Sequence, residues 1–238
     1  MKVITVIPAR FASTRFPGKP LVKLAGKTII QHVYDNMKSA SFLDDVIVAT
    51  DDQRIYDEVV NFGGKVRMTS SEHKSGSDRV AEVARKIEAD VIVNVQGDEP
   101  FLKPELLEEL VKSFADPEVA VASMMHKVKT GFTNPNNVKV VCDANDFALY
   151  FSRAPIPYPR DTELKDETPF FKHIGIYAYR KDALLKFVEL PVSQLESLEK
   201  LEQLRLLENG FRIKMIPTKY SGVGIDTPED LAEAEKMI

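Results

Sequence analysis

The chain has 238 residues, of which 44% are hydrophobic and 29% are charged, a composition that predicts an ordinary globular protein with a substantial core. Its formal net charge is −4, from 32 basic and 36 acidic residues. A protein that binds nucleic acid through its phosphates needs a basic surface excess, so this balance argues against nucleic acid as a partner.

The single cysteine, Cys142, excludes an intramolecular disulfide and a cysteine-based zinc site. No apolar run approaches the roughly 18 residues of a membrane span, and the N-terminus lacks the features of a signal peptide. We therefore expect a cytoplasmic protein without membrane insertion.

The first half of the chain alternates strand-like and helix-like segments. Its strands are continuous Val/Ile runs, which is typical of a parallel sheet covered by helices on both faces. Ligands of such sheets bind beyond the carboxyl ends of the strands, so the loops after Ile7 and Val95 are the places to search. The predicted strands are 3–7, 45–49, 65–68, 91–95 and 119–124, and the predicted helices are 29–37, 54–62, 78–87 and 104–114.

From about residue 127, proline and asparagine clusters separate shorter strands, which predicts antiparallel additions to the sheet. No repeat and no interdomain linker is found, so we predict one domain over residues 1–238 with an elaborated second half. The predicted elements are strands at 138–141, 148–151, 174–179 and 212–216, and helices at 181–188, at 195–208 and from 228 onward.

Three cations, Arg10, Arg15 and Lys19, lie within ten residues of the loop that follows the first strand. Packed like charges repel one another unless a ligand such as a polyphosphate supplies the opposite charge. Gly18 would let the backbone approach such a ligand closely. The loop is not a Walker A motif. It predicts phosphate binding, with a solvated basic loop as the alternative.

A second candidate follows the strand at 91–95. Asp98 would stand at the ligand-binding end of the sheet, where a carboxylate beside a polyphosphate holds Mg²⁺. It could instead be a turn residue before Pro100. Gln96 could bind a base or a sugar hydroxyl.

Two helix starts are further candidates. In the segment from Ser75 to Arg79, Ser77 is a natural N-cap, and the exposed amides would also suit a ligand oxygen. Near the C-terminus, Asp226 precedes Thr227 and Pro228, which start a helix. Either helix-entry chemistry or a second metal ligand explains Asp226.

These segments, in this order, resemble the 3-deoxy-manno-octulosonate (Kdo) cytidylyltransferases over nearly the whole chain. The resemblance runs through IPARFASTRFPGKPL, SGSDR, VNVQGDEP, NPNNVKVV, ALYFSRAPIP, HIGIYAYR, LEQLRLLENG and GIDTPEDL. It implies a mostly parallel, Rossmann-like sheet of the nucleotide-diphospho-sugar transferase (GT-A-like) type with an antiparallel elaboration. It also implies a homodimer that uses Mg²⁺ to couple CTP and Kdo in lipopolysaccharide biosynthesis.

The resemblance further implies three parts: a nucleotide-binding half to about residue 125, a sugar-binding and dimerisation part at about 126–220, and a C-terminal metal-ligand segment with a helix at about 221–238. Each matching residue takes a role from it. The catalytic residues would be Arg10, Arg15, Lys19 and Asp98, and the first three would bind the CTP phosphates. The nucleotide site would add Pro8, Ala9, Ser75, Gly76, Arg79 and Gln96. The sugar site would hold Gln96, Arg153, His173, Tyr177, Glu202 and Gln203, and the metal ligands would be Asp98 and Asp226.

Without the resemblance, the later residues are ambiguous. Arg153 could be solvated, His173 a satisfied structural histidine and Tyr177 a core residue. In a continuous helix over 195–208, Leu198, Glu202 and Leu206 would share one face, so Glu202 would be partly desolvated and would need a hydrogen-bonding partner.

Other functions remain open at this point. One is a cytidylyltransferase for another acidic sugar, such as 8-amino-Kdo or a sialic acid. Another is a GT-A-like glycosyltransferase, which would release no pyrophosphate. A third is a nucleotide-sugar sensor without catalysis. The dense cation loop favours a triphosphate substrate over the last two.

Overall fold

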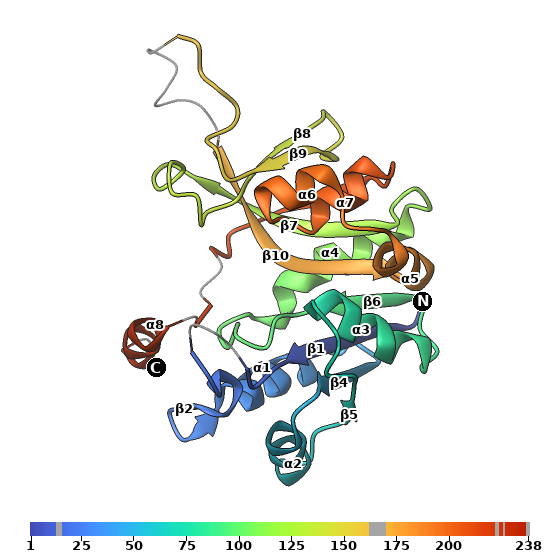
Figure 1. Cartoon of the computed structure of the whole chain (residues 1–238), viewed down its shortest axis with the longest axis vertical. Helices are drawn as coiled ribbons and strands as arrows, with labels where there is room; N and C mark the ends of the chain where they lie inside the picture. Colours follow the sequence, from blue (N-terminus) through green and yellow to red (C-terminus); the bar gives the residue numbers. More distant parts are fainter. Residues whose placement is uncertain (13–15, 162–169, 222–223, 226, 237–238) are drawn as a thin grey trace. The chain divides into compact units, whose positions relative to one another are not determined.

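The computed structural model describes residues 1–12, 16–161, 170–221, 224–225 and 227–236 (Figure 1). The chain forms two compact units. The first unit is Met1–Glu108 together with Gly222–Ile238, and the second unit is Glu109–Ser221.

The first unit contains a parallel sheet, as predicted from its Val/Ile runs. The strand order is β6-β1-β4-β5, and each neighbouring pair is parallel. All seven residues of β1 are buried, which explains why this strand shows no polar alternation. The strands are β1 (Val3–Ala9), β4 (Asp45–Thr50), β5 (Val66–Met68) and β6 (Val91–Asn94).

Helices cover this sheet on both faces. The connections from β1 through β4 to β5 run in one direction, and the connection from β5 to β6 runs back across β1 and β4. Right-handed crossovers therefore put α1 and α2 on one face and α3 on the other (Figure 1). The helices are α1 (Ile29–Lys38), α2 (Gln53–Asn61) and α3 (Gly76–Arg85), and a small hairpin of β2 (Lys23–Leu24) and β3 (Lys27–Thr28) follows the 3₁₀ helix η1 (Lys19–Leu21).

The C-terminal helix α8 (Pro228–Glu235) also belongs to the first unit. Its Ala234 and the preceding Ile225 are buried in one apolar cluster with Leu24 and Ile29. Thr227 caps α8 by accepting a hydrogen bond from the Asp230 amide. The predicted helix start at Thr227 and Pro228 is confirmed.

Two helix predictions for the first half need correction. Ser77 is not the N-cap of α3. Ser75 is, because its hydroxyl accepts from the Asp78 amide while the Asp78 carboxylate accepts from the Ser75 amide. The continuous helix predicted at 104–114 is instead three short pieces: η2 (Pro104–Leu107), α4 (Glu108–Lys112) and η3 (Ser113–Ala115).

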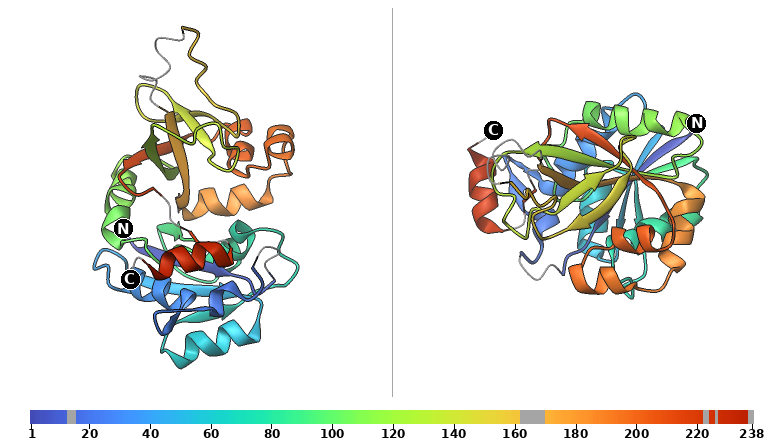
Figure 2. Two further views of the ribbon diagram at one scale, coloured as in Figure 1. Left: turned by 90° about the vertical axis from the view of Figure 1, so that its left-hand side faces the viewer. Right: turned by 90° about the horizontal axis from the view of Figure 1, so that it is seen from above.

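The second unit has the predicted antiparallel character. β10 is antiparallel to both β7 and β8, β8 is antiparallel to β9, and β11 is parallel to β7. The strands are β7 (Val121–Val128), β8 (Lys139–Cys142), β9 (Ala148–Ser152), β10 (Phe170–Arg180) and β11 (Ile213–Thr218). The helix α5 (Lys181–Glu189) contacts β10, and α7 (Gln203–Glu208) contacts β9 (Figure 2).

The single helix predicted at 195–208 is wrong. α6 (Gln194–Glu199) is followed by its C-cap residue Lys200, which has a left-handed φ of 54°. α7 begins at Gln203. The Arg205 guanidinium donates to both carboxylate oxygens of Glu196, at 2.7 and 2.6 Å, and this pair joins the two helices. The predicted shared face is therefore absent, since Leu198 is 72% exposed while Leu206 is fully buried.

Candidate active site

The loop after β1 turns sharply before Lys19. Gly18 has a left-handed φ of 73°, and its amide donates to the Phe11 carbonyl oxygen at 2.9 Å. A Cβ atom at Gly18 would lie 3.1 Å from the Phe11 ring. The guanidinium carbon of Arg54, at the start of α2, lies over the Phe11 ring, 3.3 Å from the ring centroid. Arg10 is exposed, and Arg15 lies outside the described residues.

Lys19 and Asp98 form an ion pair at the carboxyl ends of β1 and β6. Lys19 Nζ lies 2.5 Å from Asp98 Oδ2, and Lys19 is only 8% exposed. The strands that precede these loops are neighbours in the sheet, so their loops meet. Gly97 permits the close approach, since a Cβ atom there would lie 3.0 Å from the Pro8 carbonyl oxygen. The structure thus brings together two of the predicted catalytic residues.

The chain segment before α8 reaches the same place. The Ile225 amide donates to the Asp98 carbonyl oxygen at 2.9 Å, and a Cβ atom at Gly224 would lie 3.5 Å from Glu99 Oε1. Asp226, the second predicted metal ligand, lies outside the described residues. Among the described residues, no group of three or more His, Cys, Asp or Glu side chains is arranged to hold a metal ion.

The N-terminus of α3 lies beside the end of β1 and the loop after β6. A Cβ atom at Gly76 would lie 3.4 Å from Pro8 Cγ and 3.9 Å from Gln96 Oε1. The Gln96 amide donates to Asn94 Oδ1 at 3.4 Å. Four of the predicted nucleotide-binding residues therefore lie around one helix N-terminus: Pro8, Ser75, Gly76 and Gln96. Ser75 caps the helix, and its contact with a nucleotide stays a prediction.

Arg79 is fully buried and binds other protein groups. Its guanidinium donates to Asp51 Oδ2 at 2.8 Å and makes a short hydrogen bond to Thr69 Oγ1. Asp51 follows β4 at the carboxyl end of the sheet, so this pair holds α3 against that end. No pattern in the sequence predicts this partnership. Direct contact between Arg79 and a nucleotide stays a prediction.

In the second unit, His173 lies on β10 among aromatic rings. Its ring centroid is 5.0 Å from that of Phe151 and 5.3 Å from that of Tyr177. His173 Nε2 lies 2.9 Å from Ser123 Oγ. Burial, with a smaller effect of Lys172, lowers the pKa of His173 to about 3. His173 is therefore a neutral, hydrogen-bonded histidine at physiological pH.

This pKa predicts a pH dependence of stability. The folded protein keeps His173 neutral at pH values where the unfolded chain protonates it. The free energy of unfolding therefore falls as the pH decreases from 6.5 toward about 3. Between pH 7 and pH 5, we expect urea denaturation to show a loss about 2 kcal/mol larger in the wild type than in His173→Gln. The other three histidines remain in both proteins, so equal losses would contradict the lowered pKa.

Arg153 is held by backbone carbonyl groups. Its side chain donates to the carbonyl oxygens of Glu199 at 2.7 Å, Pro135 at 3.0 Å and Lys200 at 3.4 Å. The Glu199 carboxylate in turn accepts from the Arg153 amide at 2.9 Å. Arg153 is thus neither freely solvated nor fully available to a ligand. Its contact with a sugar carboxylate stays a prediction.

Lys139 is a buried cation for which the sequence shows no signal. Its ammonium group is enclosed and donates to three backbone carbonyl oxygens, those of Asn134, Asn137 and Arg153, at 3.1, 2.5 and 2.5 Å. Burial lowers the pKa of Lys139. Lys139 thereby joins the loop that contains Asn134 and Asn137 to the backbone of Arg153.

The remaining predicted sugar residues lie near the start of α7. Gln203 is buried in its first turn, and Glu202 is the N-cap residue. Burial raises the pKa of Tyr177, with smaller contributions from Tyr179 and the Glu202 carboxylate. Glu202 is therefore within electrostatic reach of Tyr177. The helix face that Glu202 was predicted to share with Leu198 and Leu206 is absent.

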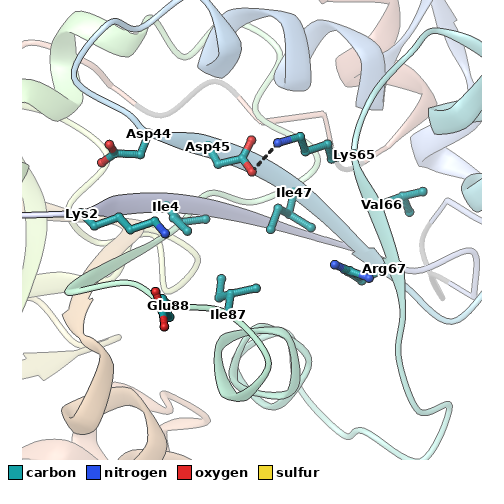
Figure 3. A pocket seen from close by; sticks show the side chains of 10 residues that line it. All are labelled: Lys2, Ile4, Asp44, Asp45, Ile47, Lys65, Val66, Arg67, Ile87 and Glu88. Atoms are coloured by element: carbon teal, nitrogen blue, oxygen red, sulfur yellow. Dashed lines mark hydrogen bonds and ion pairs between the residues drawn. The ribbon is translucent and has the colours of Figure 1, made fainter.

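A cavity of about 600 Å³ in the first unit lies elsewhere (Figure 3). It adjoins the amino ends of β1, β4 and β5, opposite the end where open α/β sheets bind ligands. An ion pair of 2.7 Å between Asp45 and Lys65 lies on its wall. None of the predicted site residues lines it, and its lining is Lys2, Ile4, Asp44, Asp45, Ile47, Lys65, Val66, Arg67, Ile87 and Glu88.

The fold and the site define a class. At the carboxyl ends of its parallel strands, the first unit has a lysine–aspartate pair, a basic loop and a helix N-terminus. Groups of this kind at this end of the sheet are typical of a nucleotide-binding protein. A cytidylyltransferase family model matches residues 4–216. The chain is thus a nucleotidyltransferase of the cytidylyltransferase class.

Known relatives give the particular family. The 3-deoxy-manno-octulosonate cytidylyltransferase of Flavobacterium johnsoniae is 51% identical over 243 residues, covering 100% of this chain and 99% of the relative. That of Geobacter sulfurreducens is 49% identical over 249 residues and covers 100% of both chains. The chain belongs to the 3-deoxy-manno-octulosonate cytidylyltransferase family.

Solved structures agree with the fold. A CMP:2-keto-3-deoxy-manno-octonic acid synthetase complexed with CTP superposes with a TM-score of 0.95 at 44% identity, covering 100% of this chain and 98% of the other. A 4-diphosphocytidyl-2C-methyl-D-erythritol synthase from Anaerococcus prevotii, at 15% identity and a TM-score of 0.64, shares the fold alone. The predicted fold class is confirmed. In the described part of the chain, no helix is both long and apolar enough to cross a membrane.

Proposed function

We propose that the protein couples CTP and Kdo to give CMP-Kdo and pyrophosphate. It does so as a Mg²⁺-dependent cytoplasmic homodimer that supplies lipopolysaccharide biosynthesis. The observation that carries the proposal is the pair of Lys19 and Asp98 at the carboxyl ends of β1 and β6. Relatives that cover the whole chain act on Kdo by name, and one solved relative binds CTP.

The reaction is an in-line attack by the anomeric C2 hydroxyl of Kdo on the α-phosphorus of CTP. The new bond joins that oxygen to the phosphorus, the bond to the β-phosphate oxygen breaks, and pyrophosphate leaves. The protein supplies position and charge, without a covalent enzyme intermediate. Lys19, Arg10 and Arg15 neutralise the phosphates and the charge that develops on the leaving group.

Asp98 fits a role as ligand of Mg²⁺. Lys19 engages Oδ2 of its partly exposed carboxylate, which leaves Oδ1 for a cation. The Ile225 amide on the Asp98 carbonyl oxygen brings the segment before Asp226 to the same loop, and Asp226 is the second proposed ligand. When bound, Mg²⁺ would lower the pKa of the attacking hydroxyl and neutralise the phosphates.

The acidic sugar is assigned to the second unit. Arg153, His173, Tyr177, Glu202 and Gln203 would surround it. Several of these side chains are already fixed by protein contacts, for example His173 by Ser123 and Arg153 by three carbonyl groups. Such fixed side chains suit recognition, because little order has to be gained on binding.

The proposal is tested by pyrophosphate release from the purified protein, using each of the four nucleoside triphosphates with Kdo, 8-amino-Kdo or a sialic acid. We expect pyrophosphate only with CTP, Kdo and Mg²⁺ together, because the cation loop fits a triphosphate and the relatives are named for Kdo. Omitting each component in turn is the control. Equal turnover with a sialic acid or 8-amino-Kdo, or none with Kdo, would contradict the assignment.

A further inference from the structure

The pairing of β10 with β7 is interrupted beside His173. The register is regular through Ile174 opposite Met124 and resumes at Tyr177 opposite Ser123, so two residues of β10 are extra. The Ser123 hydroxyl lies against this bulge. Its oxygen is 2.8 Å from the Ile176 carbonyl oxygen and 3.2 Å from the Ile174 carbonyl oxygen. The same oxygen is 2.9 Å from His173 Nε2.

These three distances determine which atom carries the histidine proton. A serine hydroxyl has one proton to donate, and a carbonyl oxygen can only accept. The Ser123 proton must therefore go to the carbonyl groups, because oxygen atoms 2.8 Å apart without a proton between them would repel each other. The hydroxyl then has only lone pairs to offer His173. Nε2 must be the donor, and Nδ1 is left without a proton.

The other ring nitrogen, Nδ1, is accessible. It makes no hydrogen bond with a described residue. Among the described residues, only Thr5 Oγ1 and Arg79 Nε lack both a hydrogen-bonding partner and contact with solvent, so Nδ1 itself reaches solvent. The small exposed fraction of His173, 9%, thus includes an accepting nitrogen. A nitrogen in this state attracts a hydroxyl group and repels a carboxylate.

We propose that Ser123 is a positioning residue that fixes His173 as the Nε2–H tautomer, so that Nδ1 accepts a hydrogen bond from a hydroxyl group of the sugar substrate. The proposal rests on the assignment of the sugar to the second unit. It deepens that assignment by giving His173 a hydroxyl group of the sugar as its partner. The lowered pKa of His173 agrees with a neutral ring that cannot serve as counter-ion to an acid.

The tautomer can be measured without substrate. Long-range ¹H–¹⁵N correlation spectra of uniformly labelled wild-type protein distinguish the protonated from the bare nitrogen of each imidazole, and the spectrum of His173→Gln identifies the signals of His173. We expect the pattern of Nε2–H with bare Nδ1 across pH 6 to 8. A ring protonated at Nδ1 would overturn the proposal, whatever the kinetics show.

The catalytic consequence is tested with Ser123→Ala. This variant removes the acceptor of Nε2–H, so we expect a mixture of tautomers and a KM for Kdo that rises about tenfold, with the KM for CTP unchanged. Ser123→Thr keeps the hydroxyl and should restore both the tautomer and the KM. Ser113→Ala is the matched control, because it removes a hydroxyl of the same unit that bonds only the Leu110 carbonyl oxygen.

The outcomes are distinct. If Ser123→Ala keeps the wild-type tautomer or the wild-type KM for Kdo, Ser123 is a structural residue of the bulge and the proposal is wrong. If Ser123→Ala does not fold, the wild-type spectrum and Ser123→Thr still decide the matter. Failure of the proposed function would appear separately, as wild-type protein that forms no CMP-Kdo from CTP and Kdo.

Discussion

Asp98→Asn is expected to lower kcat by on the order of 10² or more, because the change removes negative charge where the proposed metal neutralises the reacting phosphates. The fold should survive. Asparagine has nearly the same shape, and its amide oxygen can still accept the hydrogen bond that Lys19 Nζ now gives to Oδ2 at 2.5 Å. The measurement is pyrophosphate release as a function of Mg²⁺ concentration.

A matched control is Asp35→Asn. Asp35 also pairs with a lysine, since Lys27 Nζ lies 2.7 Å away, but this pair is exposed on α1. The chemical change is identical, so unchanged activity in this variant would show that the loss at Asp98 is specific. Near-normal turnover of Asp98→Asn at low Mg²⁺ would refute the metal role. The carboxylate would then be a turn residue before Pro100.

Lys19→Ala should reduce kcat/KM for CTP by about 10² or more. Removing a preorganised group that stabilises negative charge in the transition state typically lowers the rate by about this factor. Kdo binding should be nearly intact, because the proposed partner of Lys19 is phosphate. Steady-state kinetics with each substrate varied in turn, together with direct Kdo binding by calorimetry, would separate the two effects. An unchanged kcat/KM for CTP would contradict the phosphate role.

Lys19→Ala also leaves the Asp98 carboxylate without its ion-pair partner, which complicates the result. Lys19→Arg addresses this, because it restores the charge with a different shape and should recover part of the activity. Lys27→Ala removes an exposed, ion-paired lysine and should be neutral. If Lys19→Arg is as inactive as Lys19→Ala, the position of the ammonium group matters more than its charge.

The sequence predicted the sheet of the first unit well, because β1, β4 and β6 are almost entirely buried and therefore appear as nearly unbroken apolar runs. It predicted the helix over 195–208 wrongly. That stretch has no proline or glycine before Gly210, yet the helix is interrupted at Lys200. The interruption lets Glu196 and Arg205 form a buried pair, whereas residues nine apart in one continuous helix would lie on opposite sides of it. Tertiary contacts of this kind override local propensity and leave no local pattern.

The sequence predicts which loops form the candidate site, but not which side chains pair with one another there. Topology alone places the loops after Ile7 and Val95 at one end of the sheet, and Lys19 and Asp98 indeed meet there. Arg79 with Asp51, and His173 with Ser123, are 28 and 50 residues apart in sequence. Such separations are fixed only by the packing of elements, so the supporting side chains had to come from the structure.

The order of the two units along the chain has a consequence for biosynthesis. The second unit is one continuous segment, whereas the first unit needs residues from both sides of it. A ribosome therefore delivers the whole second unit before it delivers Ile225 and Ala234, which complete the apolar cluster with Leu24 and Ile29. Until then the nascent protein lacks the segment that binds the Asp98 carbonyl oxygen. The end of the first unit's sheet where Lys19 and Asp98 lie is thus completed only after the second unit has been made.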